Sequence, residues 1–195
     1  MKKFELTNEF VTFLGKKLFR IKALISFGNV KEGELGGYVE KEENLSNDGN
    51  AWVYGDARVY GNAEVSGDAR VYGNARVFGD AEVSGNARVF GNARVYGNAE
   101  VSGNARVFGD AEVSGNARVF GNADYATVQG FGSEYRATTF FRTKAGDIGV
   151  RCGCFYGTLE EFRAKVRETH GETKTAKEYL MVADLMEFRF SKEEA

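Results

Sequence analysis

Few residues in this chain of 195 amino acids have side chains suited to covalent or metal chemistry. His170 is the only histidine and follows a predicted helix, where an imidazolium stabilises the helix end; a catalytic general base is the alternative role. Cys152 and Cys154 fall on the same side of a predicted strand, but no second Cys or His pair completes a metal site. We therefore expect two reduced thiols that serve as small core residues, and we predict no enzymatic activity, catalytic residue, metal or cofactor.

Arginine and aromatic side chains, by contrast, recur at regular intervals and suit ligand binding. Guanidinium groups pair with phosphates and rings stack on bases, so such a surface could receive a nucleotide, a nucleic acid or a host protein. The predicted binding residues are Tyr54, Arg58, Tyr72, Arg76, Phe90, Arg94 and Phe108. A second aromatic set, on a face shared with Glu64, Glu82 and Glu100, is the predicted contact of a homodimer or homotrimer and consists of Tyr60, Phe78 and Tyr96. The alternative is that both sets only stabilise the fold by stacking.

These side chains belong to a six-residue repeat that runs without interruption from Val53 to Asp124. Each of its twelve units starts with Val, which is followed by an aromatic residue (Tyr or Phe) or Ser at the second position and by Gly at the third. The fourth position is Asn or Asp, the fifth is Ala and the sixth is Arg, Glu or Asp. Strand alternation in Ala-Arg-Val-Tyr places Ala and Val on one side, and Gly-Asn or Gly-Asp favours a corner. We therefore expect short strands, regular corners and a narrow interior of Val and Ala.

A longer period of 18 residues defines one coil of three strands and three corners. Within it the residue after Val is aromatic, aromatic and Ser in turn, while the charged position is Arg, Glu and Arg. Parallel pairing of each strand with the one a coil later predicts a mainly β, triangular solenoid of about four to six coils. Like charges then stack in columns, which end in the opposite charge at Glu112, Arg118 and Asp124.

This pattern resembles the left-handed parallel β-helix of hexapeptide-repeat proteins, in which an aliphatic residue and a small residue point inward. The resemblance implies the left-handed sense of the coil. It also raises an acyltransferase-like enzyme as the catalytic alternative, with His170 as the only available base. Such enzymes carry a catalytic His on or beside a loop that projects from the coils, and the twelve units contain neither His nor an insertion.

Two flanking segments are predicted to cover the open ends of the solenoid. The predicted divisions are an N-terminal β cap at 1–46, the β-helix at 47–130 and a C-terminal α+β cap at 131–195. In the N-terminal cap we expect a strand at 18–25 and a glycine-rich connection at 33–37.

The C-terminal cap is predicted to hold a hairpin and two helices. Residues 138–143 and 148–155 have the composition of paired strands. Thr158 and Glu161 form the pattern of a capping box, which opens a helix that should end by Gly171. A second helix is expected at 177–186.

The flanks carry a second resemblance. Residues 18–24, 36–46 and 152–162 look like a family of hexapeptide-repeat proteins encoded by phages and prophages, and the likeness covers nearly the whole chain. The resemblance implies a viral setting in the host cytoplasm and a counter-defence role, in which the protein binds a host defence protein or sequesters a signalling nucleotide. A purely structural, self-assembling protein is the remaining alternative.

Charge and hydropathy limit the function further. Lys and Arg total 26 against 28 Asp and Glu, so the formal charge of −2 favours neither a nucleic-acid coat nor an acidic mimic of DNA, although nucleic-acid binding stays open. No apolar run near the N-terminus predicts a signal peptide or membrane span, so we expect a cytoplasmic protein without a membrane partner. The predicted function is a non-catalytic binding or assembly scaffold.

Overall fold

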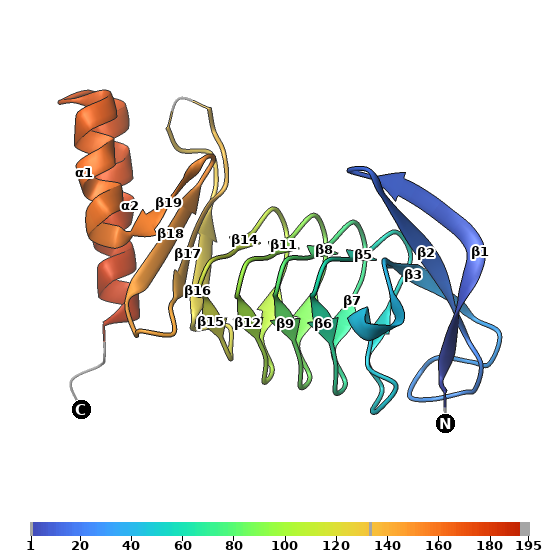
Figure 1. The fold of residues 1–195 in the computed structure, drawn as a ribbon. Coiled ribbons are helices and arrows are strands. Elements are labelled where there is room, and N and C mark those ends of the chain that lie inside the picture. The colour runs from blue at the N-terminus through green and yellow to red at the C-terminus, as the bar shows by residue number, and fades with distance from the viewer. Residues whose placement is uncertain (1, 133, 192–195) are drawn as a thin grey trace.

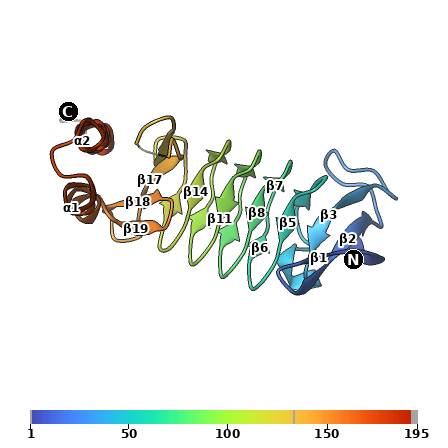
Figure 2. The same cartoon turned by 90° about the horizontal axis from the view of Figure 1, so that it is seen from above.

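Three sheets, whose coil strands pair in parallel, surround a narrow apolar interior in the computed structural model, which describes residues 2–132 and 134–191 (Figure 1). Residues 1, 133 and 192–195 of the two predicted caps lie outside the described residues. Seen from above, the coils stack along one axis between a β hairpin at one end and a pair of helices at the other (Figure 2). The predicted triangular parallel β-helix, with caps at both ends, is confirmed.

Each coil contributes one short strand to each sheet. The first sheet contains, in spatial order, β1 (Phe4–Phe13), β2 (Lys16–Ala23), β3 (Leu35–Val39), β5 (Arg58–Val59), β8 (Arg76–Val77), β11 (Arg94–Val95) and β14 (Glu112–Val113). The second contains β4 (Trp52–Val53), β7 (Arg70–Val71), β10 (Arg88–Val89) and β13 (Arg106–Val107). The third contains β6 (Glu64–Val65), β9 (Glu82–Val83), β12 (Glu100–Val101) and β15 (Arg118–Val119).

Backbone hydrogen bonds between coils fix the register at 18 residues. Strand β5 pairs with β8 so that Arg58 lies opposite Arg76. The bonding continues around the corners, where the Asn62 amide donates to the Gly79 carbonyl at 2.8 Å. Every position of the repeat therefore stacks on its equivalent in the next coil. The repeat valines have no exposed surface and form continuous columns in the core, as predicted.

Glycine occupies the corners for two separable reasons. Gly97 has a φ of +71°, which L side chains rarely adopt, and an added Cβ would lie 2.9 Å from the amide nitrogen of Gly115 in the next coil. Gly109 has a similar φ of +68°, but nothing lies within 4 Å of an added Cβ. Corners inside the stack therefore need glycine both for backbone conformation and for the close approach of the next coil.

The N-terminal cap starts the first coil earlier than the sequence predicts. Strand β2 lies at the predicted strand, and β3 pairs in parallel with β5. The expectation of a connection at 33–37 is wrong from Leu35 onward, because Leu35, Gly36 and Gly37 are strand residues in β3. A Cβ on Gly36 would lie 2.5 Å from the Ile21 side chain, and one on Gly37 would lie 2.7 Å from the Ala57 carbonyl. These glycines permit close packing and do not form a turn.

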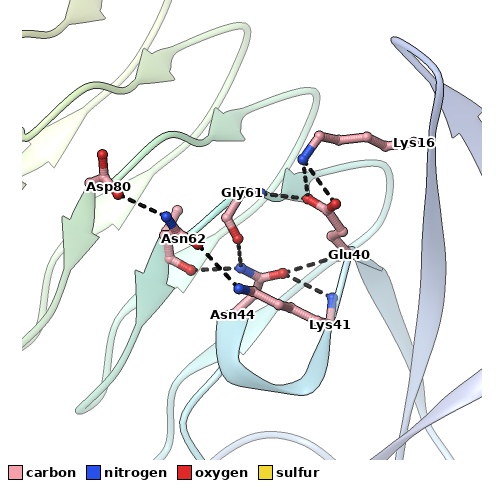
Figure 3. Close-up of polar contacts among 8 residues, drawn as sticks. Lys16, Glu40, Lys41, Asn44, Gly61, Asn62 and Asp80 are labelled. Carbon is pink, nitrogen blue, oxygen red and sulfur yellow. Dashed lines mark hydrogen bonds and ion pairs between the residues drawn. The ribbon is translucent and has the colours of Figure 1, made fainter.

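A polar cluster fastens this cap to the coils (Figure 3). The short 3-10 helix η1 (Glu42–Asn44) ends at Asn44, whose buried amide donates to the Gly61 carbonyl at 3.1 Å. The Glu40 carboxylate accepts from the Gly61 amide at 2.7 Å and from Lys16 Nζ at 2.8 Å. Burial alone would raise the pKa of Glu40, but these two hydrogen bonds hold it below its usual value. The cluster therefore ties the hairpin, η1 and the first full coil together.

Trp52 and Lys3 close the N-terminal end of the interior. Trp52 is fully buried, and the rings of Phe4 and Phe27 meet it edge-on with centres 6.3 and 5.4 Å away. Lys3 is 2% exposed, and its Nζ donates to the Ala51 carbonyl at 3.0 Å. Burial lowers the pKa of the Lys3 ammonium from 10.5 to about 8, a shift that nearby aspartates partly oppose.

The C-terminal cap consists of a four-stranded antiparallel sheet covered by two helices (Figure 1). Strands β17 and β18 form the expected hairpin, and Thr158 accepts from the Glu161 amide in the expected capping box. The second helix is longer than predicted at both ends. The elements are β16 (Tyr125–Val128), β17 (Thr138–Arg142), β18 (Ile148–Cys152), β19 (Phe155–Thr158), α1 (Leu159–His170) and α2 (Lys174–Phe190).

The last of the twelve repeat units does not complete a corner. Ala123 is exposed, whereas the other repeat alanines point inward. The Asp124 carboxylate accepts from two preceding backbone amides at 2.9 Å and turns the chain, so that Tyr125 is buried at the end of the interior and begins β16. The expected stack of Asp124 on Arg106 is therefore wrong, and Asp124 pairs with Arg142 at 3.6 Å.

A pair of glycine substitutions separates the two corner requirements. Gly109→Ala should lower the free energy of unfolding by about 1 kcal/mol through its backbone conformation alone. Gly97→Ala should lower it by about 2–4 kcal/mol, because the next coil must also move. Urea unfolding measures both values, and equal losses would contradict the close approach of stacked corners.

Lys3 predicts a stability that depends on pH. Its pKa falls from 10.5 to about 8 on folding, so the folded state releases the proton first and the contribution of Lys3 to stability rises between these pH values. As the pH rises from about 7 to about 10, the unfolding free energy of the wild type should increase by about 1–3 kcal/mol relative to that of Lys3→Met, which has no titratable group at this position. A difference that is constant with pH would show that Lys3 is not desolvated.

Candidate functional site

On each repeat strand that carries a charged residue, that residue and the aromatic or serine residue two positions later share one outer face. Arg70 and Tyr72 flank the buried valine of β7, and Arg58 and Tyr60 flank that of β5. A corner instead separates each aromatic residue from the charged residue of its own repeat unit. The structure therefore divides the predicted binding residues between two faces. One face has Tyr54, Tyr72, Phe90 and Phe108, and the other has Arg58, Arg76 and Arg94.

The face made by β3, β5, β8, β11 and β14, here the hairpin face, is covered at its N-terminal end by the β1–β2 hairpin. The Phe13 ring meets Tyr60 edge-on with centres 5.7 Å apart. The guanidinium carbons of Arg58 and Arg76 lie 4.6 and 4.8 Å from the centre of the same Phe13 ring. Tyr60 is 7% exposed and stacks on Phe78 at 5.0 Å. Two predicted ligand-binding arginines are thus engaged by the chain itself.

The other end of the hairpin face is neutralised by Glu112. This carboxylate accepts from Arg94 at 3.0 Å, from the Tyr96 hydroxyl at 3.2 Å and from Arg151 of β18 at 3.2 Å. Arg151 also lies over the Tyr96 ring. Glu112 is therefore the opposite charge that the sequence predicts at the end of this arginine column. The aromatic set predicted for self-association is contacted by the chain's own side chains at both ends.

The face of β6, β9, β12 and β15, here the glutamate face, is acidic. Glu100 pairs with Lys144 at 2.6 Å and with Arg118 at 3.7 Å, again the predicted opposite charge. Glu64 and Glu82 are exposed in the earlier coils of the column. The carboxylates make this face unsuited to an anionic ligand.

The face of β4, β7, β10 and β13, here the groove face, has arginines without acidic partners. Arg70, Arg88 and Arg106 stack in parallel register, and no ion pair involves them within residues 2–132 and 134–191. An aromatic ladder follows them, because Tyr72 stacks on Phe90 with centres 4.8 Å apart and planes at 3°. Phe90 stacks in turn on Phe108 at 5.2 Å and 14°.

An open groove of about 400 Å³ lies at the N-terminal end of this ladder. Asn29, from the loop between β2 and β3, lines it together with Tyr54, Arg70, Tyr72 and Arg88. Burial raises the pKa of the Tyr54 phenol, Arg70 opposes part of that rise and a nearby glutamate adds to it. Tyr54 therefore stays protonated near neutral pH and can donate a hydrogen bond into the groove.

Two of the groove arginines lie outside the predicted binding set. Grouping by repeat unit puts Arg70 and Arg88 together with Ser66 and Ser84, although the runs Arg-Val-Tyr and Arg-Val-Phe carry the alternation that puts each arginine beside an aromatic residue. No local pattern could predict Asn29, because its place in the groove depends on how the N-terminal loop packs against the coils.

The single histidine and the two cysteines lie in the C-terminal cap. His170 is the last residue of α1, and its ring centre lies 5.8 Å from that of Tyr179. Cys152 is half-buried, and the Thr138 hydroxyl donates to its Sγ at 3.1 Å. The expected core position is wrong for Cys154, which is exposed because it lies in the turn between β18 and β19. In the described part of the chain, no three metal-ligating side chains gather.

Comparison with known proteins agrees with the coil geometry. The family model described as YdcK beta solenoid repeat matches residues 51–67, 69–85, 81–97 and 87–101. The chain carries a β-solenoid repeat. No curated protein matches it. Among the described residues, no helix combines the length and apolar character needed to cross a membrane.

Phe13 predicts a measurable link between the hairpin and the coils. Phe13→Ala should lower the free energy of unfolding by about 2–3 kcal/mol, because it removes the ring that packs on Tyr60 and beneath two guanidinium groups. Phe10→Ala is the matched control on the same strand, since that ring is 44% exposed, and should cost less than about 1 kcal/mol. Urea unfolding followed by circular dichroism compares them, and equal losses would contradict the covering role of the hairpin.

Proposed function

We propose that this protein is a non-catalytic binding scaffold that takes a nucleotide at the groove face. One observation carries the proposal: Arg70 and Arg88 lie beside Tyr54 and Tyr72 in one groove, and among the described residues they form no ion pair. On the hairpin face, Phe13 packs against arginines of the column and Glu112 pairs with Arg94. The arginine column of the groove face has no such contacts among the described residues, and this distinguishes it from the hairpin face.

The two groove arginines suit a phosphate group. Their strands pair directly, so their backbones lie about 4.8 Å apart and their planar donor groups can reach the same anion. Each guanidinium offers a fork of N–H donors that matches phosphate oxygens. Repulsion between the stacked cations is relieved when a multiply charged anion binds them both. This chemistry favours a phosphorylated ligand.

The tyrosines suit the base of a nucleotide. One face of the Tyr72 ring is occupied by Phe90, and no other ring of the described residues stacks on its opposite face, toward the coil of Tyr54. A base can stack there, with a contribution of about 1–3 kcal/mol. The Tyr54 hydroxyl and the Asn29 amide supply donors and acceptors for the polar edge of a base.

The same geometry disfavours a long single strand of nucleic acid. Proteins that bind such strands stack successive bases on free ring faces. Along the ladder from Tyr72 to Phe108 the ring faces are occupied by one another. A compact ligand with few bases therefore fits the groove face better than a polymer.

The biological setting belongs to the same proposal. The resemblance of the flanking sequences to phage-encoded proteins supports sequestration of a host signalling nucleotide as a counter-defence function. The groove is lined within one chain, so binding there does not require the homo-oligomer predicted through Tyr60, Phe78 and Tyr96.

Calorimetric titration with ATP tests the proposal. Replacing both Arg70 and Arg88 with Gln should weaken binding at least about tenfold, because two charge-assisted contacts to phosphate are lost. Arg76→Gln is the matched control, since Arg76 has the same place in the repeat on the hairpin face. Absence of binding by AMP, ATP and GTP, or equal loss in the control, would overturn the nucleotide site.

A further inference from the structure

The aromatic ladder of the groove face borders a second cavity at its C-terminal end. This cavity has a volume of about 410 Å³. It lies where the last coil meets β16 and the end of α2. Its lining residues are Phe108, Asn122, Tyr125, Ala126, Thr127 and Arg189.

The second cavity repeats the chemistry of the groove. Phe108 is 52% exposed, and among the described residues only Phe90 stacks on its ring. Arg189 is exposed, forms no ion pair within the described residues, and makes only a long contact of 3.5 Å from its guanidinium to the Asn122 carbonyl. Each end of the ladder therefore combines a ring with a free face, a guanidinium group and an amide side chain.

Arginines connect the two ends. Arg88 lines the groove, and Arg106 is the next residue in the same column, paired in register with Arg88. The Arg106 amide donates to Asn122 Oδ1 at 2.9 Å, which joins the last coil to the second cavity. A ligand that lies along the ladder would meet cationic groups over its whole length.

We propose that the groove face binds a dinucleotide, in which two bases are joined through a chain of phosphates. One base stacks on the free face of Tyr72 and the other on the free face of Phe108, beside Arg189, while the phosphates contact the column of Arg70, Arg88 and Arg106. The inter-ring spacings of 4.8 and 5.2 Å, with a stacking contact of about 3.5 Å at each end, place the bases roughly 17 Å apart. This inference rests on the proposed nucleotide site and specifies its ligand class.

Titration with diadenosine tetraphosphate and with ATP tests the inference. Because the second base binds as part of a tethered ligand, the dinucleotide should bind at least about tenfold more tightly than ATP, with one ligand per chain. Phe108→Ala and Arg189→Gln should each remove most of this advantage, while the affinity of the Tyr72 groove for ATP stays within about twofold. Thermal unfolding checks that both variants remain folded.

Phe120→Ala is the matched control, because Phe120 is 48% exposed on the glutamate face with Arg118 over its ring, and it should leave both affinities unchanged. Equal affinity for ATP and the dinucleotide, or no effect of Phe108→Ala, would overturn the inference and leave the nucleotide site intact. If neither ATP nor the dinucleotide binds the wild type, the nucleotide site and the inference are both overturned.

Discussion

The parallel hydrogen bonds between coils are the constraint on which the rest of this structure depends. They hold each residue directly against its equivalent 18 positions away, as in the pairing of Arg58 with Arg76. The interior gains from this register, because valine stacks on valine and alanine on alanine without exposed surface. The outer faces inherit the same order, so arginines stack on arginines at a spacing of about 4.8 Å, where like charges repel. Each column must therefore be neutralised, covered or left available to a ligand.

The charged columns of the three outer faces differ in what contacts them. On the hairpin face, Phe13 packs against two guanidinium groups and Glu112 neutralises Arg94 and Arg151. On the glutamate face, Lys144 and Arg118 neutralise Glu100 at the end of the column. On the groove face the last repeat unit turns away, Asp124 pairs with Arg142, and the arginine column keeps no acidic partner among the described residues. The proposed binding function follows from this one uncompensated column and the ladder beside it.

Periodic and local features could be predicted from the sequence. The 18-residue coil, the inward Val and Ala, the β17–β18 hairpin and the capping box at Thr158 each follow from spacing or from a short motif. Features that depend on packing between distant segments could not. Gly36 and Gly37 look like a turn but allow close contact between the cap and the coils. The site was only partly predicted: Tyr54 and Tyr72 lie in the groove, whereas their arginine partners come from β7 and β10 of the same face and not from the repeat units of the two tyrosines.

Side-chain NMR of the arginines during addition of ATP distinguishes the groove face from the hairpin face, because each Nε–H resonance reports on one guanidinium group. The resonances of Arg70 and Arg88 should move with the ligand concentration. Those of Arg76 and Arg94, already engaged by Phe13 and Glu112, should stay in place. Shifts confined to the hairpin face, or no shift in any arginine, would contradict the claim that the uncompensated column is the binding surface.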